Sequence, residues 1–366
     1  MSTVLTEVDR TLSYIVNYTD EPVVTHADGA YIYIGGRKLI DTSMGNGTHI
    51  LGHNSNVQFK HGTLYGTCKA FDVDKYGSLL NILTGFSKFA LCNTGAEATM
   101  RAARIARAAT GKDTVVMFDG GWHGGCDTFL DGIGIPKNVK DLCVKLPYSD
   151  QGIEWVRKHP TAMVIVEPVQ GSLPRANRPF LEGLRNACDD TGTLLCFDEL
   201  ITGFRLCKGG GKQYFKILPD LVTYGKIAGG GFPIGIVSGR DDLMSLDVRL
   251  GGTFSGNPAS IQAGYNVLSQ LGLPVYNFID GQGKVFRKRL NMPTCGVESF
   301  SRILFTDKPV RCRTERDQFE DHVRKKEFRD KAFEKGVYLG SNGLIFMSTE
   351  HTHDLMDEMV DTLNSI

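Results

Sequence analysis

The sequence of 366 residues lacks the features that would place a protein beside a membrane or a nucleic acid. It has no net charge, because 41 Lys and Arg balance 41 Asp and Glu, so bulk electrostatics favours neither partner. It has no apolar run of membrane-spanning length. Its N-terminal stretch lacks the basic segment and apolar run of a secretion signal. We expect a cytoplasmic protein that acts on small molecules.

Paired cysteines are also missing, although cysteine itself is present. The nine cysteines are scattered, their number is odd, and no two have the C-x-x-C spacing. This pattern favours free thiols in a reducing compartment over a disulfide framework or a zinc site, and we expect no metal. Tryptophan is scarce, with two residues, whereas the 43 glycines cluster beside polar residues. Such clusters suit backbone that a ligand approaches closely, since glycine has no Cβ.

The middle of the chain alternates short apolar runs with helical patterns. The runs predict strands at 89–92, 114–118, 162–167, 193–198, 221–224 and 234–238, and the helices are expected at 96–111, 180–190 and 355–366. Strands separated by helices indicate an α/β fold with a mainly parallel central sheet flanked by helices. We expect residues 51–266 to form this large domain. Residues 1–50 and 267–366 would form a small α+β domain from both chain ends.

Two reactive side chains follow predicted strands. Asp198 comes directly after an apolar run, and Lys226 lies in the string YGKIAGGGFPIG just past the next one. The carboxyl ends of strands in an open α/β sheet form the edge where ligands bind. Taken singly, each has an ordinary alternative: a solvated loop acid, and a surface lysine before a flexible glycine loop.

Two further motifs offer groups for a flat, anionic ligand. Asn93-Thr94-Gly95 precedes the predicted helix at 96–111, and a helix N-terminus with its free N–H groups suits a phosphate. Trp122 lies in the turn GWHG, where it would stack on an aromatic ring. The alternatives are simple N-capping and a core tryptophan. Together with the carboxylate and the amine, these groups match the needs of pyridoxal phosphate (PLP).

The sequence resembles the class III aminotransferases of PLP fold type I, and within them glutamate-1-semialdehyde aminomutase. The matching strings are NTGAEATMRAARIARAATGKD, GWHGG, IVEPVQG, FLEGLRNACDDTGTLLCFDELITGFR, PDLVTYGKIAGGGFPIG and GGTFSGNPAS. They are collinear with the family over roughly Ala30 to Gly264, with a weaker match at 337–361. The resemblance implies a PLP-dependent enzyme that transfers or migrates an amino group.

The resemblance also implies roles for individual residues. Lys226 forms the Schiff base with the cofactor and shuttles the proton, and Asp198 pairs with the pyridine nitrogen. The remaining cofactor-binding residues are Thr94, Gly95 and Ala96 at the phosphate, Trp122, His123 and Leu200 around the ring, Glu167 in the EPVQG turn, and Thr253. Thr253 resembles a family threonine that reaches the phosphate of the neighbouring subunit, which implies a homodimer with shared active sites.

The departures from the aminomutase pattern concern the substrate. The aminomutase has a carboxylate-binding Arg near its N-terminus, where this chain reads Ser13-Tyr14-Ile15-Val16. Residues 338–343 lack its Phe-Glu pair, and the loop between Trp122 and Tyr148 is shorter. Ala96 replaces a hydroxyl residue. Ser13 and Asn46 are the candidates for substrate contact, and the substrate itself stays open as an amine or amino acid.

Several functions remain compatible with this sequence. The string DTSMGNGTHILGH at 41–53 is similar to dialkylglycine decarboxylase, with Asn46 near the position of a Gln that contacts the departing carboxylate, so decarboxylation is an alternative. A non-catalytic PLP-binding protein is another, which the presence of both Lys226 and Asp198 disfavours. A macromolecular substrate would use the basic residues of 308–331. Interspersed acids there favour a solvated helix face instead.

Overall fold

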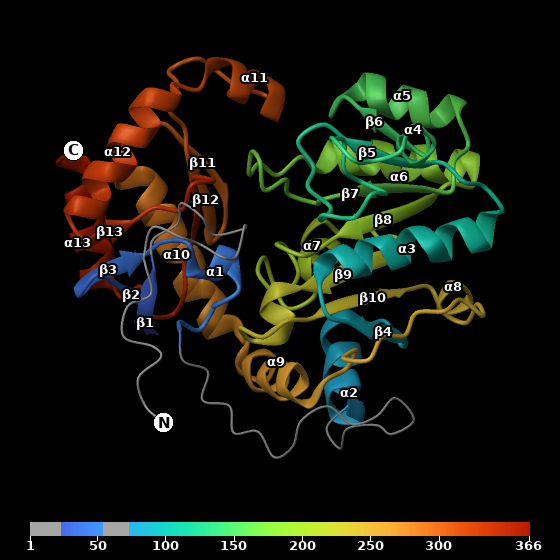
Figure 1. Ribbon diagram of the computed structural model, residues 1–366, viewed down its shortest axis with the longest axis horizontal. Coiled ribbons are helices and arrows are strands. Elements are labelled where there is room, and N and C mark those ends of the chain that lie inside the picture. Colours follow the sequence, from blue (N-terminus) through green and yellow to red (C-terminus); the bar gives the residue numbers. More distant parts are fainter. Residues whose placement is uncertain (1–22, 54–72) are drawn as a thin grey trace, which may run out of the picture.

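The computed structural model describes residues 23–53 and 73–366, and it contains three β-sheets within these ranges (Figure 1). The strands are β1 (Val24–Asp28), β2 (Tyr31–Ile34), β3 (Arg37–Asp41), β4 (Phe89–Cys92), β5 (Val115–Phe118), β6 (Cys143–Leu146), β7 (Met163–Val166), β8 (Leu194–Asp198), β9 (Leu221–Gly225), β10 (Gly235–Gly239), β11 (Thr294–Val297), β12 (Phe300–Ile303), β13 (Val337–Tyr338) and β14 (Leu344–Phe346). The helices are α1 (Met44–Gly47), α2 (Val73–Thr84), α3 (Gly95–Thr110), α4 (Lys137–Lys140), α5 (Asp150–Lys158), α6 (Arg178–Thr191), α7 (Gly210–Phe215), the 3-10 helix η2 (Lys226–Gly229), α8 (Asp241–Met244), α9 (Pro258–Gln270), α10 (Leu273–Arg289), α11 (Arg313–Phe319), α12 (His322–Glu334) and α13 (His353–Asn364).

The largest sheet has seven strands in the order β4-β10-β9-β8-β7-β5-β6. Strands β5 to β9 pair in parallel, and β10 is antiparallel to both of its neighbours, β4 and β9. The expectation of a mainly parallel α/β sheet is therefore confirmed. All six predicted strands are present, and β6 is an additional edge strand.

The central strands are buried on both faces, which explains their continuous apolar sequences. In β5 the side chains alternate between two clusters: Val115 and Met117 pack with the alanine face of α3, whereas Val116 and Phe118 pack with α5 and α6. The helices thus cover opposite faces of the sheet. The helices expected at 96–111, 180–190 and 355–366 are α3, α6 and α13.

Two smaller sheets lie beside the large one, toward the left of Figure 1. One has the order β1-β2-β3-β13 and joins strands from both parts of the described chain, because Val337 pairs in parallel with Ile40. The other is the antiparallel sheet β11-β12-β14. Pairing of an N-terminal with a C-terminal strand agrees with a small unit built from both ends. The domain boundaries at 50 and 266 stay a prediction.

None of the helices in the described ranges is both long and apolar enough to span a bilayer.

Candidate active site

The residues singled out from sequence lie at one edge of the seven-stranded sheet. Strands β5, β7, β8 and β9 run in the same direction, and β4 shares it because β10 is antiparallel to both β4 and β9. Their carboxyl ends consequently lie together, which is where ligands bind in open α/β sheets. The residues that end or follow these strands are Thr94, Trp122, Glu167, Asp198 and Lys226.

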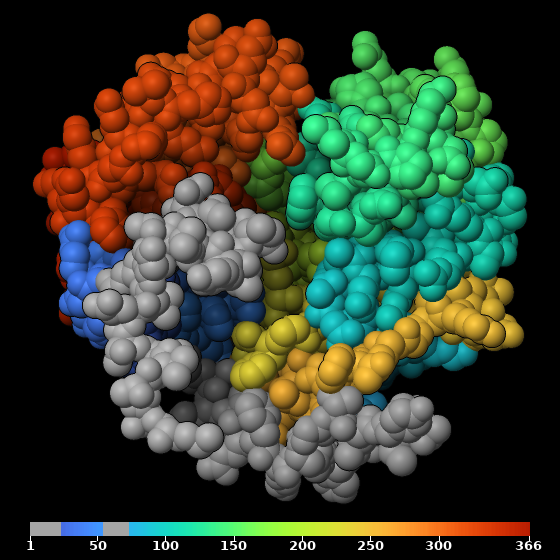
Figure 2. Space-filling model, in the orientation of Figure 1, coloured from blue at the N-terminus to red at the C-terminus, as the bar shows by residue number. Residues whose placement is uncertain are grey.

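A cavity of about 610 Å³ lies at this edge. In Figure 2 the surface is hollowed between the orange atoms of the C-terminal segment and the green and teal atoms of the sheet region. Two small-sheet elements reach the cavity as well, since Asn46 of α1 and Phe346 of β14 line it. Its lining also includes Gly95, Ala96, Trp122, Glu167, Leu200 and Lys226.

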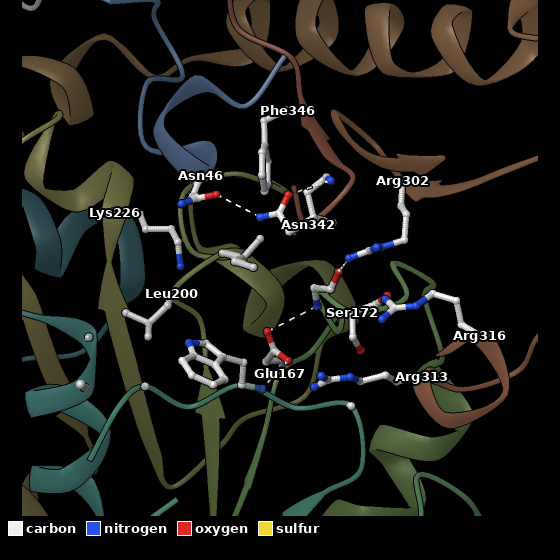
Figure 3. A pocket seen from close by; sticks show the side chains of 18 of the residues that line it. Asn46, Glu167, Ser172, Leu200, Lys226, Arg302, Arg313, Arg316, Asn342 and Phe346 are labelled. Atoms are coloured by element: carbon white, nitrogen blue, oxygen red, sulfur yellow. Dashed lines mark hydrogen bonds between the residues drawn. The ribbon is translucent and has the colours of Figure 1, made fainter. Parts of the chain in front are cut away.

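Lys226 projects its amine into this cavity from the start of η2 (Figure 3). Its backbone has a positive φ of 48°, a conformation that costs a non-glycine residue energy and is often found at functional sites. Burial lowers the pKa of Lys226, with the charge of Arg205 acting in the same sense and Asp198 and Glu167 opposing it. A lowered pKa increases the neutral fraction of the amine, which is the nucleophilic form.

Asp198 is held by three donors at the end of β8. Its Oδ2 lies 2.7 Å from Nδ1 of His123, and its Oδ1 accepts from the Leu200 N–H at 3.1 Å and the Thr223 hydroxyl at 3.3 Å. Asp198 and His123 are each 2% exposed. His123 does not line the cavity, so it contacts the carboxylate rather than the cavity itself. This pair fixes the orientation of Asp198.

Glu167 supports the turn that carries Trp122. Its Oε2 accepts from the Trp122 N–H at 3.3 Å and its Oε1 from the Gly171 N–H at 3.3 Å. Burial raises the pKa of Glu167 to about 7, the nearby charge of Asp198 adds to the rise, and His123 and Lys226 counteract it. Trp122 is 62% exposed and lines the cavity, so it is not a core tryptophan.

The N-terminus of α3 faces the cavity through Gly95 and Ala96. Thr94 caps this helix, with its Oγ1 accepting from the Glu97 N–H at 3.2 Å. The first N–H groups of a helix have no partner within it and carry its positive dipole end, which suits a phosphate. Gly124, at a φ of 94°, lets the Trp122 turn approach closely, since a Cβ there would lie 2.6 Å from Cβ of Ala96.

The other sequence candidates have different positions. Leu200 lines the cavity and lies over two glycines, because a Cβ on Gly95 or Gly225 would come within 2.7 Å of its methyl groups. Thr253 is exposed and does not line the cavity of this chain. Ser13 lies outside the described residues.

A group of basic side chains that sequence reasoning did not place here lines the rest of the cavity. These residues, called the basic wall below, are Arg302 of β12, Arg313 and Arg316 of α11, and Lys325 of α12. The interpretation of 308–331 as a solvated face is wrong for Arg316 and Lys325, whose side chains are 9% and 15% exposed, whereas Arg313, at 43%, borders the cavity and is still solvated. A usable signal was Arg302, a charged residue within the short apolar strand FSRI.

The donor set at the sheet edge fits pyridoxal phosphate. The Lys226 amine, the N-terminus of α3 and an exposed tryptophan ring border one cavity. The buried Asp198 does not itself line this cavity, but its charge acts on the pKa of Lys226. These groups match an aldehyde, a phosphate, an aromatic face and a pyridine nitrogen in turn.

Comparison with known proteins agrees with this fit. The family model for class III aminotransferases ("Aminotransferase class-III") matches residues 15–366. The chain belongs to the class III aminotransferase family. It is thus a PLP-dependent enzyme that transfers or migrates amino groups.

Curated relatives of this class III aminotransferase are similar over nearly their whole length. The glutamate-1-semialdehyde 2,1-aminomutase of Methanothrix thermoacetophila is 34% identical over 92% of this chain and 88% of its own. The glutamate-1-semialdehyde 2,1-aminomutase 2 of Lachnoclostridium phytofermentans is 35% identical over 93% and 89%.

Solved structures show the same fold. An omega-transaminase from Sphaerobacter thermophilus has a TM-score of 0.83 at 24% identity, covering 94% of this chain and 90% of that one. A glutamate-1-semialdehyde-aminomutase from Pseudomonas aeruginosa PAO1 in complex with PMP has a TM-score of 0.84 at 17% identity, covering 94% and 87%. The chain therefore has PLP fold type I, as its sequence predicted.

Proposed function

We propose that Lys226 is the catalytic amine of this class III aminotransferase and that Asp198 tunes its cofactor. The observation that carries the proposal is that the Lys226 amine opens into the cavity with a lowered pKa, at the same sheet edge as Asp198. When bound, pyridoxal phosphate supplies an electron sink for the substrate carbon that loses its proton. Lys226 would hold the cofactor through its amine, and once substrate occupies the site this amine would take up and return the proton of the substrate carbon.

The surrounding residues would anchor the cofactor and orient the side chains that contact it. The N–H groups of Gly95 and Ala96, with the Thr94 hydroxyl, hold a phosphate at the start of α3. Trp122 and Leu200, which both line the cavity, would contact the ring of the cofactor. Glu167 fixes the Trp122 turn and His123 fixes Asp198, so both are positioning residues.

We further propose a homodimer in which Thr253 completes the partner's phosphate site. Its support is that Thr253 is exposed and away from the cavity of its own chain, beside the exposed Phe254. A cytoplasmic location is also proposed. The eight described cysteines are all free thiols, in keeping with a reducing compartment.

Decarboxylation is the second candidate function, and the position of Asn46 in the cavity favours it. Asn46 lines the cavity at a φ of 54°, and its Oδ1 accepts from Nδ2 of Asn342 at 3.1 Å. This contact leaves the Asn46 amide nitrogen to donate to a carboxylate. Assay of carbon dioxide release against amine transfer on one substrate separates the two reactions.

The test of the main proposal is the variant Lys226→Ala. Borohydride reduction of the wild type should fix the cofactor to the peptide that contains Lys226, as read by mass spectrometry, and should fix none in the variant. Turnover should fall at least about 10³-fold, since the variant loses both the nucleophile and the base. Lys208→Ala, which replaces an exposed lysine that does not line the cavity, is the control and should behave as wild type. Cofactor fixed at another lysine would contradict the proposal.

A further inference from the structure

The cavity has two ends of different character. At one end lie Leu200 and Lys226, where the cofactor is proposed, and at the other lie Arg302, Arg313 and Arg316 of the basic wall (Figure 3). Glu167 is the one carboxylate among the described residues that line the cavity. The basic wall is therefore a positively charged surface that the proposed cofactor contacts leave unused.

Arg302 is the most unusual member of the basic wall. It is 4% exposed, and its Nη2 donates to the Gly171 carbonyl at a long 3.4 Å. Its Nε is buried without a partner, and no carboxylate of the described chain lies within ion-pair distance of it. Burial and the neighbouring charge of Arg316 lower the pKa of Arg302 to about 10. A buried, underbonded cation is costly unless an anion joins it.

The other three cations share two carboxylates. Asp317 pairs with Arg316 and also with Arg313, at 3.1 Å, while Glu320 pairs with Lys325 at 2.9 Å. With Arg302 included, four cations face two anions. Asp119, which accepts from Thr314 nearby, is itself paired with Lys145 at 3.1 Å. About two positive charges of the wall thus have no counter-charge in this part of the structure.

A serine hydroxyl and a glycine lie at the same end of the cavity as the basic wall. Ser172 lines the cavity, and its hydroxyl oxygen is buried without a partner among the described residues. Gly343 lies beside two of the cationic head groups, since a Cβ there would be in ordinary contact with both, 3.5 Å from Nη1 of Arg302 and 3.9 Å from Nζ of Lys325. Guanidinium, ammonium and hydroxyl donors around an open space form the donor set that binds a phosphate group.

We propose that the substrate of this enzyme carries a phosphate group at the end away from its reacting amine or carbonyl, and that Arg302 and Lys325 bind it. This proposal rests on the proposed function, which places the reacting end at Lys226. The expected substrates are small phosphorylated amines or their carbonyl counterparts. A dicarboxylate is the competing ligand, and the test distinguishes the two.

The test measures binding by calorimetry on protein saturated with pyridoxal phosphate, so that the site at α3 is filled. The probes are glycerol 3-phosphate, succinate and glycerol, none of which has an amine to react. We expect wild type to bind glycerol 3-phosphate at least about tenfold more tightly than succinate and to show no binding of glycerol. Equal or tighter binding of succinate would overturn the proposal.

The variant Arg302→Met removes the charge at similar volume. Its affinity for glycerol 3-phosphate should fall at least about tenfold, because a charge-assisted contact is lost. Arg311→Met is the matched control: Arg311 precedes α11, pairs with Glu315 and does not line the cavity, and its variant should bind like wild type. Lys325→Met, expected to lose at least about fivefold, serves if Arg302→Met fails to fold. Smaller losses in the folded variants would refute the site.

This test is independent of the proposed catalytic role of Lys226. It requires no turnover, and the borohydride experiment reads cofactor attachment without any phosphate probe. If glycerol 3-phosphate fails to bind while the cofactor is attached normally at Lys226, only the proposal for the basic wall is wrong.

Discussion

The two ends of the cavity differ in how their charges are satisfied. At the sheet edge, Asp198 has three donors and Glu167 has two, all within the chain. At the basic wall, Arg302 has one long hydrogen bond and an unpartnered Nε. The difference teaches that the acids of the sheet edge are satisfied within the chain, as suits the proposed reacting group, whereas Arg302 of the basic wall is left to pair with the proposed incoming anion.

The largest predicted effect comes from comparing two buried arginines, Arg205 and Arg302. Arg205 is 0% exposed, and its Nε, like that of Arg302, is buried without a partner among the described residues. The two differ in their Nη atoms, because Arg205 donates to the Gly47 and Met347 carbonyls and the Ser299 hydroxyl, at 2.9, 3.1 and 3.3 Å, whereas within the described ranges Arg302 donates only to the Gly171 carbonyl. Burial lowers its pKa to about 10, as for Arg302. Arg205→Met should lower the free energy of unfolding by about 4 kcal/mol, because several buried acceptors lose a charged donor.

Arg302→Met should change the free energy of unfolding by less than about 1 kcal/mol or raise it, since an uncompensated buried charge is removed. Urea unfolding of both variants measures the difference. Equal losses would show that Arg302 is a structural arginine like Arg205 and would remove the contrast between the two ends.

A pH effect of intermediate size is expected from the sheet edge. The pKa of Glu167 is raised to about 7 by burial, above its ordinary 4.5, so the folded state binds this proton more tightly than the unfolded chain does. The resulting stability is present below pH 4.5 and is lost as the pH rises through 7. Glu167→Gln should remove up to about 3 kcal/mol of that decline.

Urea unfolding at pH 4.5 and 7.5 measures this slope, with the exposed Glu358→Gln as control. Part of the slope should remain in Glu167→Gln, because burial also raises the pKa of Glu199 to about 7. An unchanged slope would mean that Glu167 is ionised throughout this range.

A smaller loss of stability than in Arg205→Met is expected where the Trp122 turn meets α3. In Gly124→Ala the new Cβ would lie 2.6 Å from Cβ of Ala96, at a φ of 94°. We expect a loss of about 2 kcal/mol in stability and weaker binding of pyridoxal phosphate, read by dialysis and absorbance. Gly125→Ala, where a Cβ meets nothing within 4 Å, is the control. Similar affinities in both variants would show that this close approach does not shape the phosphate site.

Local patterns explain which parts of the fold were predictable. The buried strands and α3 have apolar residues at the right period, so their type follows from short stretches of sequence. The strand β6 was missed because it lies at the sheet edge and places a polar residue, the exposed Lys145, within four residues. Its sequence therefore has no continuous apolar run.

The site was predictable where its residues follow strands and otherwise not. Lys226 and Asp198 lie at carboxyl ends that topology brings together. The contact of His123 with Asp198 joins residues 75 positions apart, and Arg302 approaches the cavity from a different sheet. Such contacts depend on how separate parts of the chain pack, which period and motif do not encode.

The division of the cavity between two stretches of the chain has an evolutionary consequence. The proposed reacting groups come from residues 92–230, whereas the basic wall comes from residues 302–325. Mutations in the later stretch can change which molecules are accepted while the earlier stretch keeps the bond-making groups in place. Related enzymes can therefore come to accept new substrates through substitutions in one short segment of the chain.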